Sequence, residues 1–463
     1  MDRIGAVMRM SDSTLQSAAP AIDSSVALPD AGELIALTGG TLVELHPPRM
    51  GRADVLVRGN AIVQIGGEIP EDAQRIDVGG CLVTPALVVA HSHLYMSLAT
   101  GMPAPPQTPR TLTDHLQWIW WTLDKALDEE LVHTSALVGA AMAAKAGAAC
   151  VIDLHSSPRS IAGSLDRIEL ALDEVGLRGV LAYETSDREG RGRRDGALAE
   201  NRRWLEKVKS GKSKHRAMVG AHASMSLNDD TLDALRELAE TFAVGVHVHA
   251  AEDLTDLLDA ERNRKAPLTA RLERLGVARR GSVVAHAVQL ESATIESIKS
   301  AGGVIVTNPR SNMAHGVGVC SAGGGRVALG TDGIDGDVLA EARAYWLRHT
   351  EAKDGLAREV GARVVAGQEL VTSLFGDVQQ PRLVVGARAD LTILDYDPIT
   401  PMTPSNVIEH LARGWSSAHV RHTMVGGEMV VRDRKLVKID ERELVLRGRA
   451  AASRLWERMQ GYF

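Results

Sequence analysis

The chain has 463 residues, with 52 Lys and Arg against 59 Asp and Glu, so its formal net charge is −7. This balance, without a long block of one sign, argues against nucleic-acid binding and for a soluble protein. No uninterrupted apolar run reaches membrane-spanning length. The three cysteines are too few for a disulfide scaffold and lack metal-site spacing, so we expect a reducing, cytoplasmic location.

The length predicts one large domain together with a smaller one. Residues 1–30 mix Asp, Ser, Ala and Pro without a signal-peptide pattern, and we interpret them as a flexible N-terminal tail. After this tail, short strand patterns and turn residues predict a β hairpin around Gly59-Asn60. A similar hairpin is predicted near the other chain end, around Gly426-Gly427.

These two β-rich regions are expected to form one composite domain. We assign it to residues 31–83 and 380–438, as a small β-sandwich built from both chain ends. The remaining C-terminal part, residues 439–463, has helix-favouring composition from Glu441 to Met459 and is predicted to pack as a helix on the outside.

Strand and helix patterns alternate through residues 84–379, in about eight units. This count predicts an α/β protein with a (β/α)8 TIM-like barrel. Apolar residues at helical spacing predict a helix from Leu232 to Phe242 after a cap at Asp229-Asp230, and alanine-rich Leu137 to Ala149 predicts another. The predicted strands end at polar residues, namely His93, His155, Glu184, His222, His249, His286, Asn308 and Asp332.

Four of the residues at or beside these strand ends suit one divalent cation. His91 and His93 follow an apolar strand and, being two residues apart, point to the same face. His249 and Asp332 end two later strands. Any single histidine at a strand end is more often a hydrogen-bonded core residue, but the combination predicts a catalytic metal site, with Zn2+ as first choice and Fe2+ or Mn2+ as alternatives. The fourth strand carries no lysine to bridge two ions, which favours one ion.

The residues around this predicted site define a reaction. A divalent cation lowers the pKa of its bound water to roughly 7, which supplies hydroxide to attack a carbon. Glu252 is placed to protonate a ring nitrogen as general acid. Asp332 is expected to relay a proton to the departing amine, and His286 to polarise the oxyanion or orient the water. The alternative for Glu252 is a charge at the start of a helix.

Four further residues are candidates for substrate binding. His222, His155 and Glu184 end predicted strands, where hydrogen bonding at the barrel rim is the equal alternative. Trp120 lies in a cluster with Trp118 and Trp121 that would wall a pocket for a flat ring, although packing in a core or a dimer contact explains such a cluster as well.

Several of these motifs resemble the metal-dependent amidohydrolase superfamily, in its chlorohydrolase and aminohydrolase (deaminase) branch. The matching segments are His91-Ser-His93, His249-Ala-Ala-Glu252, Ala285-His286 and Gly330-Thr-Asp332-Gly. Tyr183-Glu-Thr-Ser-Asp-Arg and Asn308-Pro-Arg-Ser-Asn-Met are similar to the SsnA-type aminohydrolases. The resemblance implies a barrel, one divalent metal, hydrolytic removal of an amino group and a homodimer. Ser92 and His315 depart from the expected pattern, and the loop with His315 is expected to affect specificity.

We therefore expect a hydrolase of small molecules that acts on carbon–nitrogen bonds other than peptide bonds. It would use metal-bound hydroxide to displace ammonia from an amino-substituted nitrogen heterocycle or a cyclic amidine. A hydrolase of C–Cl, C–S or amide bonds would use the same site. A non-catalytic, metal-stabilised subunit would have lost a ligand or the acid, and none is lost here.

Overall fold

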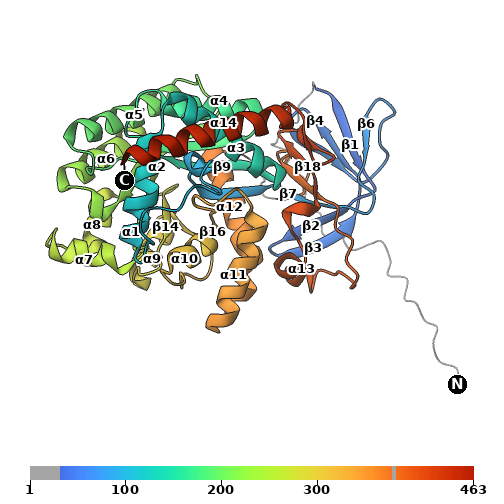
Figure 1. Ribbon diagram of the computed structural model, residues 1–463. Helices are drawn as coiled ribbons and strands as arrows, with labels where there is room; N and C mark the ends of the chain where they lie inside the picture. Colours follow the sequence, from blue (N-terminus) through green and yellow to red (C-terminus); the bar gives the residue numbers. More distant parts are fainter. Residues whose placement is uncertain (1–31, 378–381, 463) are drawn as a thin grey trace.

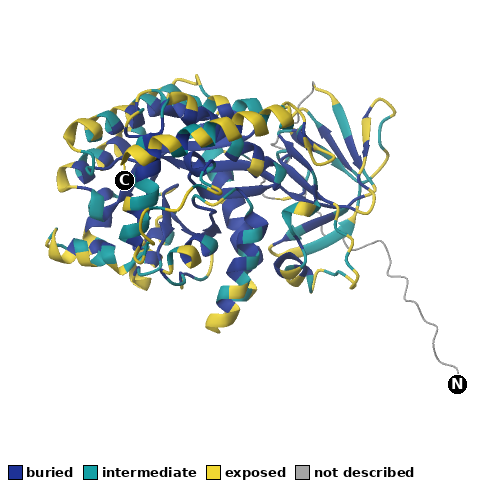
Figure 2. Cartoon of the chain, viewed as in Figure 1, coloured by how far each residue is buried: buried dark blue, intermediate teal, exposed yellow. Residues whose placement is uncertain are grey.

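The computed structural model describes residues 32–377 and 382–462, so the predicted tail of residues 1–30 lies outside the described part. Parallel strands occupy the middle of this chain and are almost entirely buried (Figures 1 and 2). They are β8 (Leu87–Ser92), β9 (Ala148–His155), β10 (Arg178–Tyr183), β11 (Arg216–Ala217), β12 (Val219–Ala223), β13 (Val246–Ala250), β14 (Val283–His286), β15 (Val304–Thr307) and β16 (Val327–Leu329). Burial on both faces explains their nearly continuous apolar sequences.

The parallel strands form two sheets in chain order. One sheet has the order β11-β10-β9-β8 and the other β12-β13-β14-β15-β16. A parallel bridge between Thr185 and Ala221 joins them at one edge, and another between Ser92 and Asp332 joins them at the other. Because all these strands run parallel to one another, their carboxyl ends lie on the same side.

Helices connect the parallel strands and cover them. The longer ones are α3 (Glu129–Lys145), α4 (Ser164–Val175), α5 (Arg191–Lys209), α6 (Asp229–Phe242), α7 (Leu254–Arg262), α8 (Leu268–Leu275), α9 (Ser292–Ser300), α10 (Pro309–His315), α11 (Val338–Ala352) and α12 (Val360–Phe375). Shorter helical segments lie between these elements, namely η2 (Leu94–Met96), α1 (Leu112–His115), η3 (Leu116–Trp120), α2 (Trp121–Ala126), η4 (Ser224–Ser226) and η5 (Leu356–Glu359). Figure 2 shows that the helices around the parallel strands turn their exposed faces outward.

Two helix predictions need correction. The helix expected from Leu137 to Ala149 ends at Lys145, because Gly147 adopts a φ of 92° and β9 begins at Ala148. The predicted cap of α6 at Asp229-Asp230 is also wrong. Asn228 is the N-cap residue, and both aspartates belong to the first helical turn, where their charges stabilise the helix dipole.

Strands from both chain ends combine in the second part of the molecule. The N-terminal strands are β1 (Leu34–Thr38), β2 (Thr41–Leu45), β3 (Pro48–Arg52), β4 (Val55–Arg58), β5 (Ala61–Ile65), β6 (Gln74–Asp77) and β7 (Leu82–Pro85). The C-terminal strands are β17 (Leu391–Leu394), β18 (Val420–Val425), β19 (Glu428–Arg432) and β20 (Lys435–Leu436). They form a four-stranded sheet, β5-β4-β1-β6, and a seven-stranded sheet, β20-β19-β18-β17-β7-β2-β3.

One apolar cluster joins these two sheets. Val55 and Ile62 of the smaller sheet pack in the same cluster as Val83, Leu391 and Met424 of the larger one. Burial of such side chains supplies the main driving force for this arrangement. The two predicted hairpins are present as β4–β5 and β18–β19.

The remaining helical segments lie near the C-terminus, as α13 (Val407–Arg413), η6 (Ser417–His419), α14 (Glu441–Met459) and η7 (Gln460–Tyr462). The predicted bounds of the last long helix are confirmed by α14, which crosses the outside of α2 and α3 in Figure 1. Within the described residues, no helix is both long and apolar enough to span a membrane. Cys81, Cys150 and Cys320 are buried free thiols.

Candidate metal-dependent active site

His91, His93, His249 and Asp332 meet at the carboxyl ends of the parallel strands. One ligand atom from each residue lies within 4.8 Å of each of the others, and all four side chains are buried. His93 Nε2 is 3.0 Å from His249 Nε2 and 3.2 Å from Asp332 Oδ1. His91 Nε2 is 3.7 Å from the same carboxylate oxygen and has no hydrogen-bond partner. The sequence-predicted ligand set is therefore brought together as one cluster.

The imidazole orientations show why this cluster suits a cation. His93 Nδ1 lies 2.6 Å from the carbonyl oxygen of Leu154, and His249 Nδ1 lies 3.0 Å from that of His222. A carbonyl oxygen only accepts, so each Nδ1 donates and carries the proton of its ring. Both Nε2 atoms are then left with lone pairs that face each other at 3.0 Å. A cation between them satisfies this arrangement. A proton on His93 does so as well, because burial lowers the pKa of His93 but the hydrogen bond to Asp332 and the negative charge of this residue outweigh burial and raise the pKa to about 9.

Burial keeps two of these rings neutral. Loss of solvent lowers the pKa of His91 to about 4, and it holds the pKa of His249 well below its usual value. A neutral imidazole is the form that binds a metal. Three nitrogens and one carboxylate oxygen are the donor set of a borderline-soft divalent ion such as zinc.

His247 is a buried residue that the sequence interpretation missed. Its Nε2 atom lies 2.8 Å from His91 Nδ1. When His91 Nε2 binds an ion, Nδ1 carries the ring proton and donates to His247 Nε2, which fixes the orientation of His91. The signal was present, because residues two apart in a strand share a face and His247 precedes His249 by two.

We expect His247→Ala to weaken zinc binding by about 10- to 100-fold, since the ring of His91 loses the partner that orients it. His247→Gln, whose amide oxygen is a similar acceptor, should retain most of the affinity. Competition with a chelator of known zinc affinity measures both. Equal affinity in the alanine variant and the unchanged protein would show that His247 has no such role.

Glu252 and His286 lie beside the cluster. Glu252 Oε2 is 3.6 Å from His286 Nε2, and a Glu252 oxygen lies within 4.8 Å of an Asp332 oxygen. His286 Nδ1 is held by Asn312 Oδ1 at 2.9 Å. The backbones of His286 and Asp332 adopt φ values of 72° and 52°, a region that L residues rarely occupy. Such backbone strain is typical of positions where the surrounding fold forces a side chain into place.

These groups line a cavity that encloses about 570 Å³ when the adjoining open solvent is included, and Trp120 and Trp121 lie in its wall. The ring of Trp120 contacts that of His93 edge-on, with 5.3 Å between centroids. It fits beside the turn after Asp332 because residue 333 is glycine, and a Cβ atom there would collide with the Trp120 ring. Trp118, the third tryptophan of the segment, is absent from the cavity wall.

Glu184 and His222 line the opposite part of the wall. His222 Nε2 lies 3.9 Å from Glu184 Oε1, and its Nδ1 contacts Ser226 Oγ at 2.7 Å. The Glu184 carboxyl group is only 3% exposed, and burial raises its pKa to about 7. His155 does not join them. Its ring is buried between Tyr95 and Tyr183, its Nε2 contacts Ser157 Oγ, and it is not part of the cavity wall.

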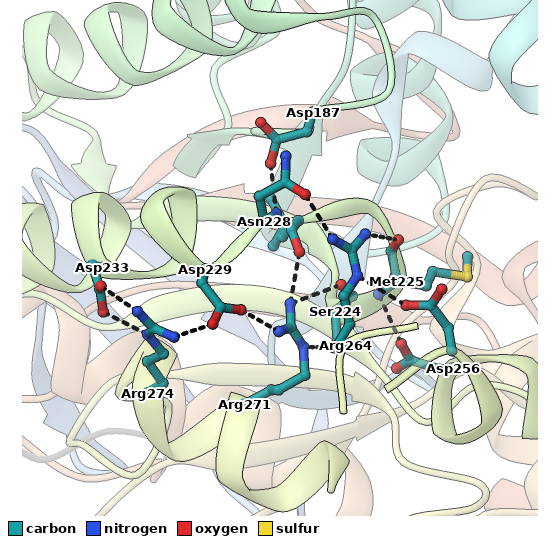
Figure 3. Close-up of polar contacts among 12 residues, drawn as sticks. Asp187, Ser224, Met225, Asn228, Asp229, Asp233, Asp256, Arg264, Arg271 and Arg274 are labelled. Atoms are coloured by element: carbon teal, nitrogen blue, oxygen red, sulfur yellow. Dashed lines mark hydrogen bonds and ion pairs between the residues drawn. The ribbon is translucent and has the colours of Figure 1, made fainter. Parts of the chain in front are cut away.

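A polar network holds Met225 and Asp256 of the cavity wall (Figure 3). Asp256 accepts hydrogen bonds from the backbone N–H of Ala251 and of Met225, each at 3.0 Å. Arg264 donates to the Met225 carbonyl, and Arg271 to Ser224 Oγ. The loop that precedes Glu252 is thereby fastened to the turn after β12.

A buried cluster of three histidines and one aspartate, placed at strand ends beside a carboxylic acid and a ligand-sized cavity, defines a metal-dependent hydrolase. Comparison with known proteins gives the same class. The sequence model of the amidohydrolase family matches residues 82–362, more than half of the chain, and the protein belongs to this family.

Particular relatives agree with this assignment. The chain is 27% identical over 389 residues to a 5'-deoxyadenosine deaminase of Methanopyrus kandleri, which covers 81% of this chain and 86% of the relative. An adenosine deaminase from Xanthomonas campestris, solved with bound zinc, superposes with a TM-score of 0.78 at 22% identity over 92% of this chain and 98% of its own. An atrazine chlorohydrolase from Arthrobacter aurescens TC1, complexed with zinc, superposes with a TM-score of 0.73 at 18% identity, over 90% of this chain and 100% of its own. These structures share the fold.

Proposed function

We propose that the protein is a hydrolytic deaminase of adenosine-like heterocyclic amines that uses one zinc ion held by His91, His93, His249 and Asp332. The observation that carries this proposal is the 3.0 Å approach of His93 Nε2 to His249 Nε2, with the Nδ1 atom of each ring placed on a carbonyl oxygen. A curated relative that acts on 5'-deoxyadenosine supports the substrate class.

The side chains around the ion have separate tasks in this proposal. When bound, the ion supplies Lewis acidity and an activated water as the nucleophile. Glu252 delivers a proton to the ring nitrogen next to the carbon under attack, because that nitrogen must accept charge as the tetrahedral centre forms. Asp332 receives the proton of the water and passes it to the departing amine. His286, fixed by Asn312, stabilises the developing oxyanion.

The cavity wall supports a substrate without an anionic group. Among the described residues, neither lysine nor arginine lines the cavity. Glu184 does line it, and its carboxyl group can accept hydrogen bonds from substrate N–H or O–H groups. Arg188 is buried nearby and is not part of the wall. Its Nη2 atom pairs with Asp124, while Nε and Nη1 have no hydrogen-bond partner among the described residues. Trp120 and Trp121 provide aromatic surfaces for a flat ring.

We expect 5'-deoxyadenosine and adenosine to be deaminated with a kcat/KM at least about 100-fold above that of adenosine 5'-monophosphate, since burial of an unpaired phosphate charge costs about 3 kcal/mol or more. Ammonia release by the purified, zinc-loaded protein measures this ratio. Equal rates for the nucleotide would contradict the charge argument. If no purine, pterin or pyrimidine amine yields ammonia but a chlorinated triazine yields chloride, the reaction is dechlorination and the proposed deamination is wrong.

The finer architecture also remains a proposal. We propose that the two parallel sheets close into a (β/α)8 barrel, residues 84–379, and that residues 31–83 and 380–438 form the separate β-sandwich domain. A homodimer and a cytoplasmic location are predictions that sedimentation analysis and cell fractionation test.

A further inference from the structure

Helix α10 contacts Asp332, which is a proposed metal ligand, and also His286 and Glu252 beside it. Ser311 Oγ donates to Asp332 Oδ2 at 2.5 Å, and Asn312 Oδ1 lies 2.9 Å from His286 Nδ1. One turn after Asn312, His315 Nδ1 lies 3.0 Å from Glu252 Oε1. Residues three apart share a helix face, so this single short helix directs Asn312 to His286 and His315 to Glu252.

The two oxygens of Glu252 have different surroundings. Oε1 is bonded to His315, whereas Oε2 faces His286 at 3.6 Å. The backbone before Glu252 is fixed by the hydrogen bond from Ala251 to Asp256, but that bond leaves the side-chain torsions free. The Glu252 side chain is 13% exposed at the mouth of the cavity. Without His315, its carboxyl group is free to rotate toward solvent.

His315 is itself held in place. Its side chain is 9% exposed, and its ring lies 5.0 Å from the ring of His115 and 6.0 Å from that of Trp120, between centroids. Gly316, with a φ of 67°, ends α10 directly after it. The contacts on both sides leave the ring little freedom, so it is a rigid partner for Glu252.

We propose that His315 is a positioning residue for Glu252. It holds Oε1 so that Oε2 is presented to the reacting ring nitrogen, and Asn312 of the same helix sets His286 against it. The inference rests on the proposed function, in which Glu252 is the general acid. It explains what the departure of His315 from the expected sequence pattern does in this chain.

The test is a comparison of His315→Ala, Glu252→Gln and the double variant in deamination of 5'-deoxyadenosine. We expect His315→Ala to lower kcat about 10- to 100-fold with KM changed less than about threefold, since a misplaced catalytic group costs rate. The double variant should be no slower than Glu252→Gln, because His315 acts through that carboxyl group. If the two single losses in kcat multiply in the double variant, or if His315→Ala changes only KM, the proposal is wrong.

Rescue by a conservative variant gives an independent answer. His315→Asn places an amide N–H near the position of Nδ1 and should recover most of the lost kcat, and the proposal fails if Asn is as slow as Ala. The matched control is His349→Ala on α11, which removes another buried histidine bonded to a carboxylate, that of Asp354 at 2.6 Å. It should lower the melting temperature without lowering kcat.

Zinc content and melting temperature of each variant show whether the site has assembled. A His315→Ala protein that has lost zinc would owe its slow turnover to the metal site, and this outcome would also overturn the positioning role. If the unchanged protein releases no ammonia from any amine, the proposed function fails before the variants are compared, which separates the two failures.

Discussion

Glu252→Gln should lower kcat by about 10³-fold while zinc content stays at the value of the unchanged protein. Glutamine keeps the size and the hydrogen bond to His315, but its amide cannot deliver a proton to the ring nitrogen, and general acid catalysis contributes about 10²- to 10⁴-fold. The position of Glu252, 3.6 Å from His286 and within 4.8 Å of Asp332, is the reason to expect the large end of this range. Steady-state ammonia release and metal analysis of the same preparation measure both quantities.

A suitable control is Glu261→Gln, which removes an exposed carboxylate near the C-terminal end of α7 and should leave kcat unchanged. A Glu252→Gln protein that turns over within about tenfold of the unchanged enzyme would exclude the carboxyl group as the acid. Proton delivery would then have to come from another group of the cavity, such as His315.

His249→Ala should remove zinc and abolish deamination, by at least about 10³-fold in kcat/KM, because the ion supplies the nucleophile. It should also reduce stability. An ion that binds only the folded chain contributes RT ln(1 + [L]/Kd), about 4 kcal/mol at a thousandfold excess over Kd. The melting temperature of the unchanged protein should therefore fall by several degrees in the presence of a strong chelator and recover when zinc is restored.

Scanning calorimetry with and without chelator measures this stability term, and metal analysis measures occupancy. The matched control is His215→Ala, which removes a buried histidine paired with Asp173 at 3.0 Å, away from the metal ligands. It should retain zinc and its chelator-dependent melting shift. A His249→Ala protein with full zinc occupancy and normal turnover would contradict the assigned ligand set.

The metal cluster could be predicted from the sequence because strand periodicity is local. Two histidines at positions 91 and 93 share a face by geometry alone, and parallel strands in chain order bring later strand ends to the same side. The sequence alone therefore predicts that His249, His286 and Asp332 lie at one rim. The same reasoning, applied to Val246-His247-Val248-His249, would have found His247 as well.

Other features depend on contacts that a sequence pattern does not contain. His155 ends a strand as His93 does, yet Tyr95 and Tyr183 enclose its ring and keep it from the cavity. The pairing of His315 with Glu252 joins residues 63 apart, from two different strand-helix units. Such contacts follow from the lengths and angles of the loops, which periodicity leaves undetermined.

The most direct test of this account is a crystal structure of the zinc-loaded protein, with anomalous scattering recorded on both sides of the zinc absorption edge. The account predicts one strong peak, about 2.0 to 2.2 Å from the Nε2 atoms of His91, His93 and His249 and from a carboxylate oxygen of Asp332. A peak coordinated by Glu252 and His315 instead, or none at the histidine cluster, would contradict it.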